Sequence, residues 1–234
     1  MSAGSLGSQF ADLGMDRHLL NRSSTAERVA SILRDRIAEG LLEPGTRLSE
    51  EAIGEALGVS RNTLREAFRL LTHERLLVHE LNRGVFVRTL TKEDVVALYR
   101  VRRVIECAAV REPTRAPEEA LARIRQAVDD GEAAARDDRW PDVGTANIHF
   151  HQAIVSLAGS SRLDEFMNQI LAELRLIFYV MKDPRRFHEP YLTRNRELST
   201  AIESGEFVAA EALLSRYLAD AERQLVRAYA RALE

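Results

Sequence analysis

The chain has 234 residues, of which 45% are hydrophobic and 29% are charged, and its 33 Lys and Arg residues against 36 Asp and Glu residues give a net charge of −3. This length and apolar content suit one or two globular domains with a sizeable core. The slightly acidic balance excludes a protein that coats nucleic acid without regard to sequence.

Residues 1–22 are rich in Gly and Ser and lack the basic and apolar regions of a signal peptide, so we predict a flexible N-terminal arm. No run approaches the roughly 18 apolar residues of a membrane span. Cys107 is the only cysteine, which excludes an intrachain disulfide and a cysteine-based zinc site. Its helical surroundings predict a small buried hydrophobe. We therefore expect a cytoplasmic protein with no membrane partner.

Residues 44–71, PGTRLSEEAIGEALGVSRNTLREAFRLL, predict a helix, a tight turn and a second helix. Gly58 is placed as the C-terminal stop of the first helix, and Ser60 as the N-cap of the second. This layout is typical of a helix-turn-helix domain, whose second helix enters the DNA major groove. Apolar residues recur on one face of the second helix at Leu64, Ala67, Phe68 and Leu71.

The predicted second helix carries polar side chains away from that apolar face. Arg61 and Arg65 lie four residues apart and share a face, where either can make a forked contact to guanine or hold a phosphate. Asn62 and Arg69 also lie off the apolar stripe. The helix N-terminus adds free N–H groups and a partial positive charge. Spacing alone leaves open an ordinary helical hairpin with solvated arginines.

Two short β-type runs follow at residues 76–81 and 85–88, joined by Asn82-Arg83-Gly84. An Asn/Gly turn between such runs predicts a β-hairpin, and a hairpin directly after a helix-turn-helix makes a winged helix. The wing tip carries Arg83, which either reaches phosphate or the minor groove or is a solvated turn residue. Residues 60–91 hold six arginines against three glutamates, a local charge of +3 that favours a site-specific DNA reader.

The run from residue 43 to residue 87 resembles the DNA-binding domain of GntR-type bacterial transcription regulators. The resemblance implies DNA contacts by Ser60, Arg61, Asn62, Arg65 and Gly84, and with Thr63 and Arg83 these form the predicted DNA-binding set. Glu51 departs from the pattern, because some members place an arginine ten residues before the Arg61 position. The matching motifs are Pro44-Gly45, Leu48-Ser49-Glu50, Gly58-Val59-Ser60-Arg61, Leu64-Arg65-Glu66-Ala67 and Arg83-Gly84.

After residue 89 the strand-type runs end and helical periodicity takes over. Thr91 caps the first of six predicted helices, with Glu93 and Asp94 in its first turn. The short links predict an all-α bundle over residues 92–233, following a winged helix over residues 23–89. The fold class is therefore mostly α. The six helices are expected to reach Pro113, to span 117–138, 141–158 and 161–182, to run from Pro190 to 204, and to span 207–233.

This second part resembles the FCD-type effector-binding domain of the FadR/VanR branch of the GntR family. Six helices favour the VanR-like subgroup over the seven-helix FadR form. The resemblance implies a domain that binds an effector and forms a dimer. The motifs that carry it are Leu98-Tyr99-Arg100-Val101-Arg102, Ile105-Glu106, the NIHFH run at 147–151 and the AIESGE run at 201–206.

Many members of this branch hold a divalent metal with one Asp and three His, and the matching positions here are Asn147, His151, Asn195 and Tyr217. Only His151 is intact, and one neutral imidazole cannot hold a transition metal tightly. Tyr217 would need to lose a proton with a pKa of about 10. We therefore expect no metal cofactor. His149 cannot help, because it lies on the opposite helix face from His151; His188 is the reserve partner for a His151 metal site.

The remaining polar cluster consists of Asn147, His151, Asn195 and Tyr217, with Arg102 expected beside it. In the family an arginine at this position often faces the cavity and can pair with a carboxylate. We predict a metal-free pocket for a small organic acid or a larger acyl-type effector. A satisfied polar core without any ligand is the alternative.

These features predict a ligand-responsive transcription regulator that binds a near-palindromic DNA operator as a homodimer. Family analogy favours a repressor. The alternatives are the same regulator with a residual divalent-metal site at His151, an all-α metal-dependent enzyme, and a winged helix that binds protein. The enzyme has little support, since the sequence lacks HExxH, a Gly-rich phosphate loop and a nucleophile elbow.

Overall fold

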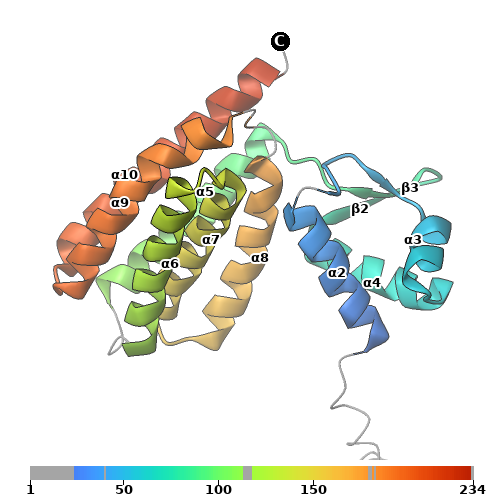
Figure 1. Cartoon of the computed structure of the whole chain (residues 1–234), viewed down its shortest axis with the longest axis horizontal. Helices are drawn as coiled ribbons and strands as arrows, with labels where there is room; N and C mark the ends of the chain where they lie inside the picture. The colour runs from blue at the N-terminus through green and yellow to red at the C-terminus, as the bar shows by residue number, and fades with distance from the viewer. Residues whose placement is uncertain (1–23, 40, 113–117, 179–180, 182, 233–234) are drawn as a thin grey trace, which may run out of the picture.

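The structure is a computed structural model that describes residues 24–39, 41–112, 118–178, 181 and 183–232. The predicted N-terminal arm at 1–22 lies outside these residues. Figure 1 shows two parts, a small domain of helices and a sheet at the N-terminal end and a bundle of long helices after it. None of the described helices is both long enough and apolar enough to cross a membrane.

The N-terminal domain is a winged helix. The helix α3, Glu50–Leu57, begins at a cap in which the Ser49 side chain accepts from the backbone N–H of Ala52, and it ends at Gly58 in the left-handed conformation at φ 62°. The tight turn that follows leads directly into α4, Arg61–His73. The domain comprises α2 Thr25–Glu39, β1 Arg47–Leu48, α3 Glu50–Leu57, α4 Arg61–His73, β2 Leu77–Glu80 and β3 Gly84–Val87.

The strands form an antiparallel sheet in the order β1-β3-β2. Glu80 pairs with Gly84 and Arg47 pairs with Phe86, so the wing is a hairpin with β1 added to its outer strand. The predicted hairpin is confirmed with one correction. Gly84 is the first residue of β3 rather than part of the turn, which Asn82 makes with a φ of 60°.

The second domain is an all-α bundle, as the sequence predicted. Thr91 and Asp94 form a reciprocal capping box at the start of α5, Lys92–Arg111. Buried residues recur along each helix, and Cys107 is among them, as expected. Within the described residues the bundle contains α5 Lys92–Arg111, α6 Glu118–Arg136, α7 Trp140–Ser156, α8 Ser161–Phe178, α9 Pro184–Glu203 and α10 Phe207–Ala232.

The start of α9 was predicted wrongly. The sequence placed it at Pro190, whereas the helix begins at Pro184 and contains Pro190. The Asp183 side chain accepts a hydrogen bond from the backbone N–H of Arg186, and Pro184 occupies a first-turn position that needs no N–H. This cap and proline start the helix early enough that Pro190 falls inside its second turn.

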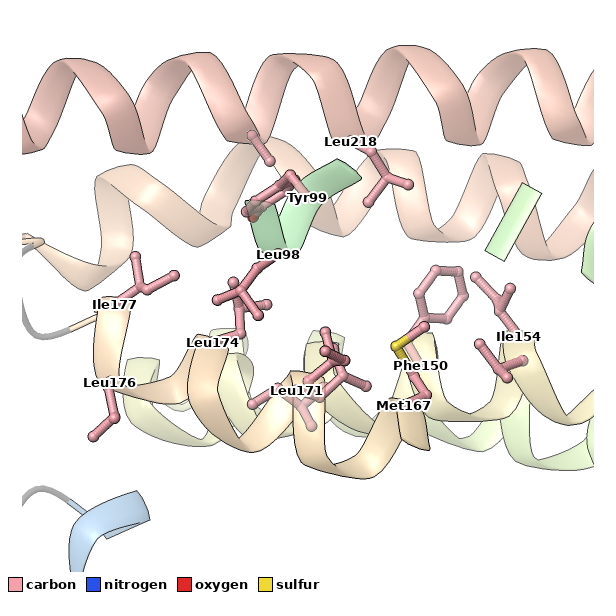
Figure 2. Packing of buried hydrophobic residues seen from close by; sticks show 14 of the residues in the cluster. Leu98, Tyr99, Phe150, Ile154, Met167, Leu171, Leu174, Leu176, Ile177 and Leu218 are labelled. Carbon is pink, nitrogen blue, oxygen red and sulfur yellow. The ribbon is translucent and has the colours of Figure 1, made fainter. Parts of the chain in front are cut away.

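The helix α8 packs on two sides. Figure 2 shows Leu171 and Leu174 pointing into the bundle, with Leu174 close to Leu98 of α5, while Leu176 points the other way, towards α2. Leu176 is nevertheless buried. A buried leucine on this face indicates that apolar packing joins α8 to the winged helix.

An ion-pair cluster spans the same boundary. Arg88, just after β3, donates to Glu173 of α8 at 2.9 Å and to Asp94 of α5 at 2.7 Å. Glu173 is almost fully buried, and burial raises its pKa even though the charge of Arg88 lowers it. Arg88 thus ties the end of the wing to two helices of the bundle.

Candidate nucleic-acid interface and effector site

The second helix of the helix-turn-helix, α4, has one buried and one exposed face. The predicted stripe Leu64, Ala67, Phe68 and Leu71 is buried. Arg61, Asn62, Arg65 and Arg69 are exposed on the other side, so the structure brings the predicted polar face together. The first turn of this face is where a recognition helix meets base edges.

Ser60 fixes the start of α4. Its hydroxyl accepts a hydrogen bond from the backbone N–H of Thr63 at 3.1 Å, which confirms the predicted N-cap. The Thr63 hydroxyl lies 2.8 Å from the same oxygen, so both side chains gather at the helix N-terminus. The N-terminal N–H groups and these hydroxyls together suit an approaching phosphate.

Three exposed arginines of the interface are paired with acids of the same domain. Such exposed pairs are worth about 0–1 kcal/mol, so DNA phosphates can replace the carboxylates at little cost. The pair between α4 and α3 could not be predicted from the sequence, because its partners are fifteen residues apart along the chain. The pairs are Arg65–Glu50 at 3.0 Å, Arg69–Glu66 at 3.2 Å, and Arg83–Glu80.

The wing presents Arg83 beside Gly84. The Arg83 guanidinium carbon lies 5.4 Å from the Phe86 ring centroid, so the side chain lies back over the sheet. Gly84 has a φ of 110°, a conformation that side-chain-bearing residues rarely adopt. Glu51 is exposed in the first turn of α3, where its charge would face an approaching backbone phosphate.

The five predicted effector residues meet inside the bundle in a row of hydrogen bonds that also contains Glu106. We call these six residues the polar row. They come from α5, α7, α9 and α10, so the row joins four helices. Its contacts are Arg102 Nε to Glu106 Oε1 at 2.8 Å, Glu106 Oε2 to His151 Nδ1 at 2.6 Å, His151 Nε2 to the Tyr217 hydroxyl at 3.3 Å, Tyr217 to Asn147 Oδ1 at 2.8 Å, and Asn195 Nδ2 to Asn147 Oδ1 at 2.9 Å.

Burial and charge set the protonation of the row. Burial acts to raise the pKa of Glu106, but the charge of Arg102 and the contact with His151 outweigh it and lower that pKa. Burial lowers the pKa of His151. A charged Glu106 accepts only, so a neutral His151 carries its proton on Nδ1. The Tyr217 hydroxyl has one proton, and His151 Nε2 at 3.3 Å and Asn147 Oδ1 at 2.8 Å are both acceptors for it.

Glu106 was missed as a site residue. It is fully buried and neutralises Arg102, which the sequence had assigned to a ligand carboxylate. The spacing in the sequence could have predicted this ion pair, since Arg102 and Glu106 are four residues apart and share a helix face. Arg102 Nη2 remains without a hydrogen-bond partner among the described groups.

These residues do not fit a divalent transition metal. Nδ1 of His151 is held by Glu106 at 2.6 Å, and Nε2 faces the Tyr217 hydroxyl at 3.3 Å. Burial raises the pKa of Tyr217 well above its usual value, so the phenol keeps its proton. In the part of the chain that the structure describes, no three His, Cys, Asp or Glu side chains gather as a metal site requires.

The other two histidines of interest lie apart from the row. His149 is exposed while His151 is fully buried, which confirms that they occupy different faces of α7. His188 is buried between the rings of Phe178 and Phe187, with centroids 4.9 and 4.8 Å away. Burial lowers its pKa to about 4, and its Nδ1 has no described partner.

The space beside the polar row is small. A cavity of about 10 Å³ touches Asn147, Asn195 and His188, enough for roughly one water molecule. A depression of about 220 Å³ lies between α9 and α10, and Tyr217 forms part of its wall with Arg194 and Arg216. A polar groove of about 440 Å³ between α6, α7 and α8 contains His149.

Two family profiles match this chain over the parts just described. The bacterial regulatory proteins of the gntR family match residues 25–87, and the FCD domain matches residues 97–220, which is more than half of the chain. The chain belongs to the GntR family. It is a DNA-binding transcription regulator rather than an enzyme, and its FCD part is an effector-binding domain.

Individual relatives agree. The crystal structure of a GntR transcriptional regulator from Rhodococcus sp. RHA1 is 51% identical, with a TM-score of 0.84 over 88% of this chain and all of that one. The regulator YdhC of Bacillus subtilis is 28% identical over 70% of this chain and 80% of its own length. The gluconate operon repressor of Bacillus licheniformis is 40% identical over 42% of this chain and 40% of its own.

Proposed function

We propose that this regulator is a cytoplasmic homodimer that represses transcription from a near-palindromic operator. The capped N-terminus of α4, with Arg61, Asn62 and Arg65 exposed beside it, is the observation that carries the proposal. One such helix reads one half-site, and a two-fold dimer reads two. The relative named as a gluconate operon repressor favours repression over activation.

The proposed DNA contacts are tested by selecting bound sequences from a random duplex library. We expect a near-palindromic motif whose half-sites lie about one helical turn apart. Arg61→Ala and Arg65→Ala should each weaken binding to that motif, while Arg227→Ala on α10 should not. An asymmetric motif, or full binding by both α4 variants, would contradict the proposal. The full proposed contact set is Ser60, Arg61, Asn62, Thr63, Arg65, Arg83 and Gly84.

We infer that a small organic acid or acyl-type effector acts on the polar row from the depression between α9 and α10. Its wall carries two arginines, Arg194 and Arg216, and two acids, Glu197 and Asp220. Asp220 pairs with Arg194 at 2.8 Å, so Arg216, which has no acid partner among the described residues, is the guanidinium that a carboxylate would meet. The buried Tyr217 connects this wall to Asn147 and His151. Asn195 and Arg102 complete the row. A ligand there would favour one arrangement of the helices and so change DNA affinity by population shift.

Native mass spectrometry of the purified, unsupplemented protein tests the assembly and the ligand together. We expect a dimer that carries a small organic mass, and Tyr217→Phe should weaken retention of that mass while DNA binding persists. A monomer would contradict the dimer. One transition metal per chain in the same sample would favour the alternative of a residual metal site at His151.

A further inference from the structure

The arginines of the DNA-binding domain differ in whether an acid neutralises them. Five arginines lie on β1, α4 and the wing turn, and the acid pairs described above account for three of them. Arg47 and Arg61 are exposed and have no acidic partner among the residues that the structure describes. Arg61 is the first residue of the recognition helix, whereas Arg47 lies on β1, outside that helix.

Arg47 lies against the wing. On β1, Leu48 points into the core and Arg47 points out, opposite Phe86 of β3. The Arg47 Nε would be 3.3 Å from a Cβ at Gly84, so its side chain crosses the strand at the wing glycine. Arg83 lies over Phe86 on the same sheet. The wing therefore carries two arginines, and within the described part of the chain only Arg83 has an acid partner.

Two acids follow Arg47 closely along the chain. Ser49 caps α3 two residues later, and Glu50 and Glu51 fill the first turn of that helix. Figure 1 shows α3 and β3 together on the side of the domain away from the bundle. Arg65 already pairs with Glu50, so a phosphate that approached between α3 and the wing would meet Glu51 unless another cation lay in front.

We propose that Arg47 is that cation, a contact to a DNA phosphodiester beside the wing. A guanidinium matches phosphate geometry with two parallel N–H donors, and a free one needs no partner exchange to bind. This inference rests on the proposed contacts of α4 and the wing, and it adds a sequence-independent contact between them. Gly84 is part of the same site, because any side chain there would push Arg47 aside.

The test is the salt dependence of binding to a random-sequence duplex of about 30 base pairs, followed by fluorescence anisotropy. Each phosphate contact contributes about 0.9 to the slope of log K against log salt. Arg47→Gln should lower the slope by that amount. The affinity advantage of the wild type should then shrink about 3.5-fold between about 50 and 200 mM salt. Arg47→Lys should restore most of the slope.

Arg227→Gln is the matched control, since it removes an exposed arginine of α10 and should keep the wild-type slope. Arg47→Gln should weaken all duplex sequences equally, whereas Arg61→Gln should also relax sequence preference. If Arg47→Gln keeps the wild-type slope and the wild-type melting temperature, the Arg47 contact is refuted, while the proposed contacts of α4 and the wing stand. A wild-type protein that bound duplex without salt dependence would overturn the proposed DNA contacts as well.

Discussion

Replacing Glu106 by Gln removes the buried negative charge of the bundle and keeps the side chain's size. Glu106 is fully buried, within 2.8 Å of Arg102 Nε and 2.6 Å of His151 Nδ1. Arg102 is 1% exposed, so the variant leaves a cation without a counter-charge in the core. Losing one partner of a buried pair costs about 3–5 kcal/mol, a large share of the about 5–15 kcal/mol that holds a domain folded.

Urea unfolding of four proteins measures this effect. They are the wild type, Glu106→Gln, Arg102→Met and the double variant. Trp140 is the only tryptophan and begins α7, so its fluorescence reports on the bundle. Each single variant should lose about 3–5 kcal/mol, while the double variant should lose clearly less than the sum, because both charges leave together.

The same substitution in an exposed pair is the control. Glu189 pairs with Arg185 at 3.0 Å on the surface of α9, and Glu189→Gln should cost about 1 kcal/mol or less. Additive losses in the cycle would refute the reasoning. A loss of unfolding free energy in Glu106→Gln as small as that of the control would also refute it, because another group would then have to neutralise Arg102.

Three further predictions concern other parts of the molecule. Burial lowers the pKa of His188 from 6.5 to about 4, so as the pH falls the unfolded chain takes up this proton first and stability drops. Between about pH 7 and pH 4.5 the wild type should lose about 2 kcal/mol more than His188→Gln in urea unfolding, and equal losses would contradict it. Gly84→Ala forces a side chain to a φ of 110° and against Arg47, and it should cost about 1–3 kcal/mol in thermal melting; an unchanged melting temperature would show that the wing relaxes freely. Glu173→Gln removes the buried carboxylate that Arg88 reaches, and amide hydrogen exchange at residues 88–92 should quicken, whereas unchanged exchange would show that this ion pair does not hold the boundary.

The winged helix could be predicted closely because its signals are local. Ser60 and Gly58 mark helix ends by their own chemistry, and the stripe from Leu64 to Leu71 fixes which face of α4 is buried. The predicted effector residues also met in space, because family positions carried their long-range arrangement.

The features that were missed depend on contacts between distant residues or on competing local signals. The pair of Arg65 with Glu50 spans fifteen positions of the chain, and no periodicity reports it. Arg47 stands out only after β1 pairs with β3. At α9, a cap at Asp183 outweighed the usual reading of Pro190 as a helix start.

The helix α5 connects the two functions physically. Its middle carries Arg102 and Glu106 of the polar row, and its first turn carries Asp94, which shares Arg88 with Glu173. A helix moves largely as one body. A ligand that displaced Tyr217 would therefore act through the polar row on α5, whose first turn pairs with Arg88 just after the wing. Glu106, which neutralises Arg102 in the row, and Asp94, which pairs with Arg88, thus lie on one helix, and a shift of α5 along its axis would displace both carboxylates.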